Sequence, residues 1–125
     1  PKPQNPTLLS LAIIMEGTIK LHGYWRSGAT WRLRSILNMK GIEYEYIPVN
    51  LVKGEQSSEE YMKLNPAGLV PAMQIDGVCL TESMAIAEYL EETRPDSKKL
   101  LPADPVQRFH VRRLCEVINA GTQPI

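Results

Sequence analysis

The residues best placed to do chemistry lie in residues 24–37, where a short apolar strand turns into a helix. Ser27 stands at the start of this helix, and a helix N-terminus presents unpaired backbone N–H groups and a partial positive charge. Such a position can hold an anion, to which a Ser27 hydroxyl adds one directed donor. If the anion is a thiolate, the turn can activate a thiol borrowed from another molecule. On capping preferences alone, Ser27 is a plain helix N-cap.

Three further places combine suitable residues with a suitable position. Glu82 and Ser83 follow a short strand and open the next helix, where a carboxylate can be received; an exposed helix start without a ligand is the alternative. Val70-Pro71 sets a proline inside a strand, which by itself indicates packing or a sheet edge. Gln56 and Gln123 are ordinary surface glutamines when nothing else is considered.

The helix that follows Ser27 also carries two arginines and a tryptophan. Arg32 and Arg34 lie about 200° apart around a helix, so at most one of them can face the turn. A cation there would suit an anionic substrate, and a solvated or salt-bridged structural role is the alternative for both. Trp31 is expected in the core, as aromatic side chains usually are.

The composition is typical of a soluble globular domain, with 43% hydrophobic and 22% charged residues among 125. Lys plus Arg and Asp plus Glu number 14 each, so the net charge gives no support to nucleic-acid binding. No apolar run is long enough to span a membrane. Cys79 and Cys115 have neither a CxxC nor a metal-ligand spacing, and we expect both to be reduced and buried, with no metal bound.

Hydrophobic periodicity and turn signals predict the order of the elements. Strands are expected at 19–24, 42–49, 69–75 and 78–80, and helices at 28–40, 58–64, 81–92 and from 105 onward. A helix between the first two strands predicts that they are parallel, and Asp76-Gly77 predicts a hairpin that adds an antiparallel edge. The order β-α-β-α-β-β-α is that of a thioredoxin-like α/β sandwich.

The chain is expected to divide into four regions. Residues 1–17 form an N-terminal extension whose order the sequence leaves open, 18–95 the thioredoxin-like domain and 96–103 a linker. Residues 104–125 form the first helix of an all-α C-terminal domain, so we expect the chain to be a fragment. Five apolar side chains of that helix are expected to point inward: Val106, Phe109, Leu114, Val117 and Ile118.

With these elements in place, the chain resembles the zeta class of glutathione transferases from about Ile19 to its C-terminus. The Trp-Arg-x-Arg pattern of the first helix is what points to this class. The motifs shared with the class are Tyr24-Trp25-Arg26-Ser27, Trp31-Arg32-Leu33-Arg34, Lys40-Gly41-Ile42, Asn50-Leu51-Val52-Lys53, Leu64-Asn65-Pro66, Val70-Pro71, Ser83, Glu88-Tyr89-Leu90-Glu91-Glu92, Arg94-Pro95, Leu100-Leu101-Pro102 and Gln123-Pro124. The resemblance implies glutathione as the cofactor.

The resemblance makes Ser27 the catalytic residue, whose hydroxyl would donate to the sulfur of glutathione and favour a thiolate over a thiol of pKa about 8.5. The amides of Gly28 and Ala29 would support it. At these two positions the chain departs from the class, which has Ser-Ser-Cys where this chain has Ser27-Gly28-Ala29. Each lost donor is expected to weaken the hold on an anion by on the order of 1 kcal/mol or more.

The resemblance also implies how the rest of glutathione is held. Ser83 would receive the γ-glutamyl carboxylate, and Glu82, where zeta members commonly carry Gln, would receive the ammonium group. The Val70-Pro71 bond would be cis, with the Val70 backbone pairing with the cysteinyl amide. Gln56 and Gln123 match further glutathione contacts of the family.

The implied activity is the cis–trans isomerisation of maleylacetoacetate to fumarylacetoacetate through a glutathione thiolate adduct, with conjugation or dehalogenation of small α-halo acids as a side activity. The resemblance implies a small anionic electrophilic substrate and a homodimer in tyrosine and phenylalanine catabolism. Arg32, a cation near the helix start, is the residue expected to meet this substrate. Cytoplasm is the expected compartment, with mitochondria as the alternative, and neither nucleic acid nor membrane is expected as a partner. A catalytically weak glutathione-binding module is the alternative function, and a glutaredoxin-like oxidoreductase would need a cysteine at the start of the first helix.

Overall fold

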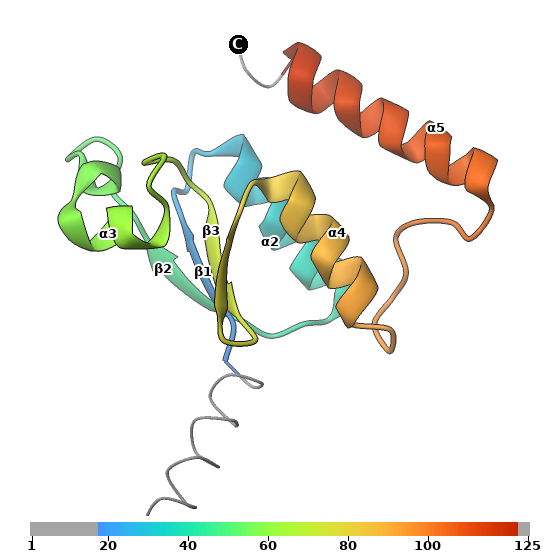
Figure 1. Ribbon diagram of the computed structural model, residues 1–125, viewed down its shortest axis with the longest axis horizontal. Helices are drawn as coiled ribbons and strands as arrows, with labels where there is room; N and C mark the ends of the chain where they lie inside the picture. The colour runs from blue at the N-terminus through green and yellow to red at the C-terminus, as the bar shows by residue number, and fades with distance from the viewer. Residues whose placement is uncertain (1–17, 123–125) are drawn as a thin grey trace, which may run out of the picture.

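A computed structural model describes residues 18–122, which are built around a four-stranded mixed sheet (Figure 1). Its strands are β1 (Lys20–Gly23), β2 (Glu45–Pro48), β3 (Ala72–Ile75) and β4 (Val78–Thr81), arranged in the order β2-β1-β3-β4. β1 is parallel to β2 and antiparallel to β3, and β3 and β4 form a hairpin. The predicted parallel pair and antiparallel edge are therefore confirmed. The paired segments are shorter than the predicted strands, because residues such as Ile42 and Tyr44 extend the apolar pattern beyond the ladder.

Helices cover both faces of this sheet. They are α2 (Gly28–Lys40), α3 (Glu59–Leu64), α4 (Ser83–Thr93) and α5 (Pro105–Glu116), with the short helices η1 (Glu55–Ser57) and η2 (Val117–Thr122). In Figure 1, α2 and α4 lie together on one face, while α5 stands apart from the sheet at the end of an extended segment. No helix within residues 18–122 is long and apolar enough to cross a membrane.

The larger core lies between the sheet and the α2–α4 pair. Successive residues of a strand point to opposite faces, and Leu21 of β1 and Met73 of β3, which are register partners, both point into this core. Leu33 and Leu37 reach it from α2, because a spacing of four residues places them on one face of that helix. The buried Ile86 and Leu90 reach it from α4. The opposite face of the sheet carries a smaller cluster under α3, made by Val49, Tyr61 and Ala72.

Helix α2 has the bounds that its sequence predicts because both ends are capped. The Ser27 hydroxyl accepts a hydrogen bond from the Thr30 N–H, and Gly41 takes the left-handed conformation with φ of 69°. The Gly41 N–H donates to carbonyls of the last helical turn, including that of Asn38. A positive φ just after a helix favours glycine. The end of α2 at Gly41 is therefore determined by the local sequence.

The hairpin between β3 and β4 turns at Asp76-Gly77, as predicted. Both residues have positive φ, 52° and 80°, which is the requirement of the two-residue type I′ turn. The Asp76 carboxylate also accepts hydrogen bonds from the Tyr89 hydroxyl, at 2.6 Å, and from the Arg94 guanidinium, at 3.0 Å. The turn is thereby tied to the end of α4.

A buried ion pair fastens the segment that leaves α4. Lys40 Nζ lies 2.6 Å from Glu91 Oε1, with the lysine side chain fully buried. Lys40 also donates to the Lys98 carbonyl at 2.9 Å, and the Glu91 carboxylate accepts from the Leu100 and Leu101 N–H groups. Burial alone would raise the pKa of Glu91, but the hydrogen bonds from Lys40, Leu101 and Leu100 outweigh it and lower that pKa to about 2. Helices α2 and α4 and the outgoing segment are thus held at one point.

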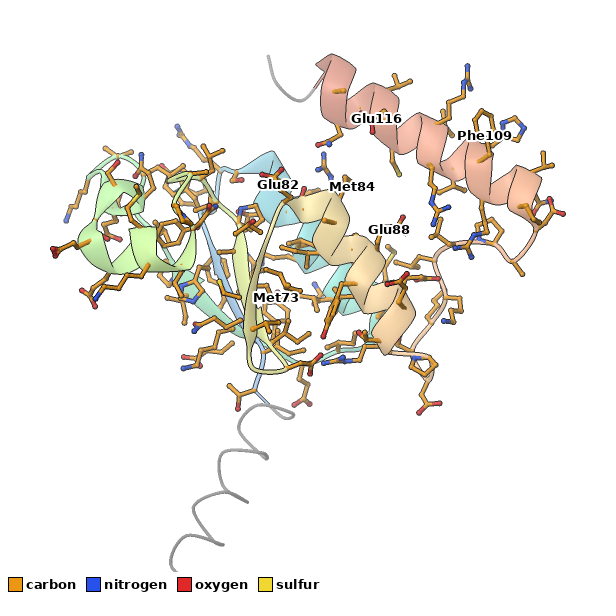
Figure 2. The ribbon with its side chains drawn as sticks, in the orientation of Figure 1. Met73, Glu82, Met84, Glu88, Phe109 and Glu116 are labelled. Carbon is orange, nitrogen blue, oxygen red and sulfur yellow. The ribbon has the colours of Figure 1, made fainter. Side chains whose placement is uncertain are left out.

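The expectation that α5 points its apolar residues inward is wrong for the described structure. Val106, Phe109, Leu114, Val117 and Ile118 are all more than half exposed. The Asp104 cap does form, with its carboxylate accepting from the Gln107 N–H. The apolar stripe was recognisable from the sequence, but no second layer of described residues lies against it (Figure 2).

Two other burial expectations also fail. Trp31 is 67% exposed, because it lies two residues from Leu33 and therefore on nearly the opposite side of α2 from the core. Cys79 is exposed, because β4 is an edge strand of the sheet, and Cys115 is partly buried; both are free thiols. Among residues 18–122, no group of three or more His, Cys, Asp or Glu side chains is placed to hold a metal ion.

Candidate functional site

The strand register brings the predicted site residues to the same end of the strands, where β1 and β4 end and β3 begins. β1 ends at Gly23, four residues before Ser27, and His22 of β1 pairs with Ala72 at the start of β3. Ala72 in turn pairs with Thr81, the last residue of β4. Ser27, the Val70-Pro71 bond and the Glu82-Ser83 pair therefore come from three chain segments that meet at the same end of neighbouring strands.

Ser27 is a helix N-cap whose hydroxyl oxygen accepts the capping hydrogen bond, so that the bond does not use the hydroxyl proton. Its backbone is extended, and Oγ accepts from the Thr30 N–H at 3.1 Å. A hydroxyl has one donor as well as two acceptor positions, so this bond leaves the Ser27 O–H able to donate. Gly28 and Ala29 are the first residues of α2, and their N–H groups have no acceptor within the helix. Capping and anion binding are therefore compatible at Ser27.

A close contact between Gly23 and Thr30 sets the position of this turn. A Cβ on Gly23 would lie 2.3 Å from Thr30 Cγ2, so the strand end can approach the helix start only because residue 23 is glycine. Thr30 is 1% exposed, and its hydroxyl accepts from the Tyr24 N–H at 3.3 Å. Thr30 was not among the predicted site residues, although a hydroxyl side chain three positions after a cap residue is a signal that the sequence carries.

Glu82 and Ser83 sit at the N-terminus of α4 in an unusual backbone geometry. Glu82 has φ of 75°, a conformation that non-glycine residues rarely adopt and that is often found at functional sites. Its side chain is exposed and makes no capping hydrogen bond (Figure 2). Ser83 is only 7% exposed, and its Oγ accepts from Arg32 Nη1 at 2.6 Å.

The Val70-Pro71 peptide bond is cis, as predicted. Val70 precedes β3 and lies outside its paired residues, so its backbone groups are not committed to the sheet. Gln56, in η1, approaches the same loop, since a Cβ on Gly68 would lie 3.4 Å from the Gln56 carbonyl oxygen. Gln56 Oε1 is buried, and within residues 18–122 it has no hydrogen-bond partner. An orphaned buried oxygen of this kind suits a donor from a bound molecule.

The two arginines of α2 have different surroundings. Arg32 contacts Ser83 and also donates to Asn119 Oδ1 of η2 at 3.1 Å. Arg34 donates to the Tyr44 hydroxyl at 3.3 Å and lies over the Tyr46 ring, 4.6 Å from its centre. Asn119 carried no signal in the sequence, because its partner is 87 positions away. Gln123 and residues 1–17 lie outside the described residues.

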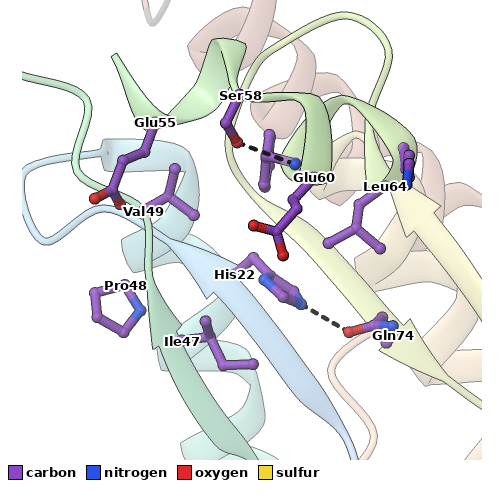
Figure 3. Close-up of a pocket in the computed structure, with 11 residues that line it drawn as sticks. His22, Ile47, Pro48, Val49, Glu55, Ser58, Glu60, Leu64 and Gln74 are labelled. Atoms are coloured by element: carbon purple, nitrogen blue, oxygen red, sulfur yellow. Dashed lines mark hydrogen bonds between the residues drawn. The ribbon is translucent and has the colours of Figure 1, made fainter. Parts of the chain in front are cut away.

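Two hollows lie beside this end of the sheet, and the predicted residues line neither. One, an open hollow of about 640 Å³, lies between α3 and the sheet, where His22 Nε2 lies 2.8 Å from Gln74 Oε1 (Figure 3). The other, of about 580 Å³, is lined by Tyr24, Trp25 and the end of β2. Ser27 is partly exposed, whereas Ser83 is nearly buried, and neither belongs to the lining of these two hollows.

The family model and the curated relatives that match this chain all point to the same family. A family model described as the glutathione S-transferase N-terminal domain matches residues 17–92. The maleylacetoacetate isomerase of Rattus norvegicus is 50% identical over 107 residues, 84% of this chain and 49% of that protein. A zeta-class glutathione S-transferase of Euphorbia esula is 43% identical over 108 residues, 86% of this chain and 47% of that protein. The chain thus spans about half the length of the curated relatives it matches.

Solved structures agree with this. A holo structure of maleyl pyruvate isomerase, described as a bacterial zeta-class glutathione S-transferase, is 44% identical with a TM-score of 0.81, over 85% of this chain and 50% of that one. The maleylacetoacetate isomerase of Methylobacterium extorquens, solved with bound malonate and glutathione, is also 44% identical with a TM-score of 0.81, over 84% of this chain and 49% of that one.

Proposed function

The chain belongs to the glutathione S-transferase family, and we propose that it forms the glutathione-binding part of a zeta-class enzyme that isomerises maleylacetoacetate to fumarylacetoacetate. The observation that carries the proposal is the position of Ser27, with an uncommitted hydroxyl proton at the N-terminus of α2, at the same end of the strands as Val70 and Ser83. The relatives named maleylacetoacetate isomerase support the choice of substrate.

In this proposal Ser27 is the catalytic residue. Its O–H donates to the sulfur of glutathione, while its Oγ stays fixed by the Thr30 N–H. The N–H groups of Gly28 and Ala29 and the positive end of α2 add to the stabilisation of negative charge at the same point. When bound, glutathione supplies the thiolate that adds reversibly to the activated double bond, so that rotation can occur about a single bond.

Each of the remaining residues is proposed to bind a different part of glutathione. Ser83, with its hydroxyl and its N–H at the start of α4, receives the γ-glutamyl carboxylate, and the Glu82 carboxylate receives the ammonium group. The Val70 backbone pairs with the cysteinyl amide. Gln56 supplies its buried oxygen as an acceptor, and Gln123 is a further proposed contact.

The partners of the whole protein follow from the same proposal. The substrate is a small anionic electrophile, and small α-halo acids are second substrates because the same thiolate can displace a halide. We also propose a homodimer and a cytoplasmic location, as part of tyrosine and phenylalanine catabolism.

Two measurements test this function. Titration calorimetry of the 125-residue chain with reduced glutathione is expected to show saturable binding, and the whole protein is expected to turn over maleylacetoacetate only when glutathione is present. Absence of glutathione binding would overturn the proposal altogether.

One observation favours a second function, a glutathione-binding module with little catalysis. Among residues 27–29, Ser27 alone has a side-chain donor, because Gly28 and Ala29 provide neither a hydroxyl nor a thiol. Tight binding of glutathione without measurable turnover by the whole protein would select this alternative.

A further inference from the structure

Arg32 joins three elements at the candidate glutathione site. One nitrogen of its guanidinium, Nη1, donates to Ser83 Oγ at 2.6 Å and to Asn119 Oδ1 at 3.1 Å. The arginine therefore links the first helix after β1 to the start of α4 and to η2. The sequence suggested that Arg32 would meet a substrate, but the structure shows it in contact with a residue that itself belongs to the candidate site.

This contact decides what the Ser83 hydroxyl can do. A guanidinium only donates hydrogen bonds, so Ser83 Oγ must be the acceptor in the bond from Arg32. The O–H of Ser83 cannot point toward Arg32 and must donate in another direction. Because Ser83 is nearly buried, Arg32 both limits the rotamers of its hydroxyl and places a fixed positive charge next to it.

We propose that Arg32 is a positioning residue that holds the Ser83 hydroxyl as a donor for the γ-glutamyl carboxylate of glutathione and couples this subsite to Asn119. The inference rests on the proposed glutathione-binding function and goes beyond it by assigning a role to a residue that does not itself contact the ligand. The charge on Arg32 strengthens the hold on a carboxylate through Ser83, since hydrogen bonds in a chain polarise one another.

The chain offers a matched control on the same helix. Arg34 has the same charge and lies only two residues away, but it contacts Tyr44 and Tyr46 rather than Ser83. Arg34→Gln therefore removes the same charge from α2 without touching the subsite, and Arg32→Gln removes both the charge and the contact.

The test measures how strongly the protein prefers glutathione over an analogue that lacks the γ-glutamyl α-carboxylate, γ-aminobutyryl-cysteinyl-glycine. Calorimetry gives both dissociation constants for each variant. Arg32→Gln is expected to weaken glutathione binding about tenfold, as for one hydrogen bond to a charged group, and to leave binding of the analogue nearly unchanged. The preference therefore shrinks, whereas a merely structural role would weaken both ligands equally. Arg34→Gln is expected to keep the wild-type preference.

Two further variants keep the inference testable if Arg32→Gln folds poorly. Asn119→Ala removes only the second anchor of the guanidinium and is expected to reduce the preference by a smaller factor. Arg32→Lys is expected to reduce the preference in the wild-type background, because it replaces the guanidinium that contacts Ser83. In a Ser83→Ala background it is expected to have no additional effect, because the group that Arg32 positions is already absent. A full preference in Arg32→Gln or Asn119→Ala, or an unchanged effect of Arg32→Lys without Ser83, would overturn the inference alone. If the wild-type chain binds no glutathione, the inference and the proposed function fall together.

Discussion

At the scale of single residues, the two serines of the candidate site each accept a hydrogen bond and have a hydroxyl proton left to donate. Ser27 accepts from the Thr30 N–H, and Ser83 accepts from Arg32, so in the proposed site each donates its own proton to glutathione. The acceptor bond orients the oxygen, and the donor bond remains for the chemistry. A substitution at either serine should therefore have separable effects on folding and on the ligand.

Ser27→Ala is expected to lower the free energy of unfolding by about 1 kcal/mol, the usual effect of losing an N-cap, and to raise the pKa of the bound glutathione thiol. Urea unfolding measures the first effect, and thiolate absorbance as a function of pH measures the second. Ser58→Ala is the matched control, because Ser58 caps α3 through the same kind of bond, 3.1 Å from the Tyr61 N–H. It should lose similar stability and leave the thiol pKa unchanged; equal pKa shifts in both variants would contradict the role of Ser27.

At the scale of the elements, local sequence signals predicted the ends of helices and the positions of turns. They did not predict the side-chain contacts between residues far apart in the sequence. Ser27 and Gly41 mark the two ends of α2, and Asp76-Gly77 marks the hairpin, because each conformation depends on the residue that adopts it. The contact of Arg32 with Ser83 joins positions 51 apart, as does that of Lys40 with Glu91. No periodicity or capping preference encodes such pairs, so they become visible only once α2 and α4 are packed together.

The buried ion pair of Lys40 with Glu91 is expected to make the stability of the fold sensitive to acid. The pKa of Glu91 is about 2 in the folded chain and about 4.5 when the group is unperturbed, so the unfolded chain takes up the proton first as the pH falls. The stability contributed by Glu91 is complete above about pH 4.5 and is lost as the pH falls toward 2. Urea unfolding across this range is expected to show a steeper acid loss for the wild type than for Glu91→Gln.

At neutral pH, Glu91→Gln is expected to cost roughly 3 kcal/mol or more, because it leaves the buried Lys40 ammonium without its partner charge. It should also speed proteolytic cleavage between residues 96 and 101, which the Glu91 carboxylate holds through backbone N–H groups. Glu88→Gln breaks the more exposed ion pair with Arg112 and serves as the control, with little change expected. Similar losses in both variants would contradict the special position of Glu91.

At the scale of the whole molecule, the structure contains one packed unit and one helix without a partner layer. The residues of the sheet, α2 and α4 bury a continuous core, whereas α5 exposes an apolar stripe. Amphipathic spacing predicted which residues of α5 would be apolar neighbours. It could not predict what covers them, because that depends on residues outside the helix, and the chain spans about half the length of its relatives.

The exposed stripe is expected to make the 125-residue chain self-associate without contributing to its stability. Phe109 is 58% exposed, so Phe109→Ser should change the free energy of unfolding by no more than about 0.5 kcal/mol while reducing self-association and binding of a hydrophobic dye. Sedimentation velocity and dye fluorescence measure the latter two. Leu37→Ala, at a fully buried position of α2, should instead cost roughly 2–5 kcal/mol. A large stability loss from Phe109→Ser would mean that α5 packs against the domain.

The strand register has a practical consequence for building a sensor from this chain. The candidate site lies at the end of the sheet where β1 and β4 end, so the loop that joins α2 to β2 lies at the opposite end of the strands, as the Asp76-Gly77 turn does. Glu43 in that loop is exposed and belongs to none of the proposed binding groups. Tethering the chain to a chip through a cysteine introduced at position 43, with Cys79 and Cys115 replaced by serine, would orient every immobilised molecule with its binding end toward the flowing analyte.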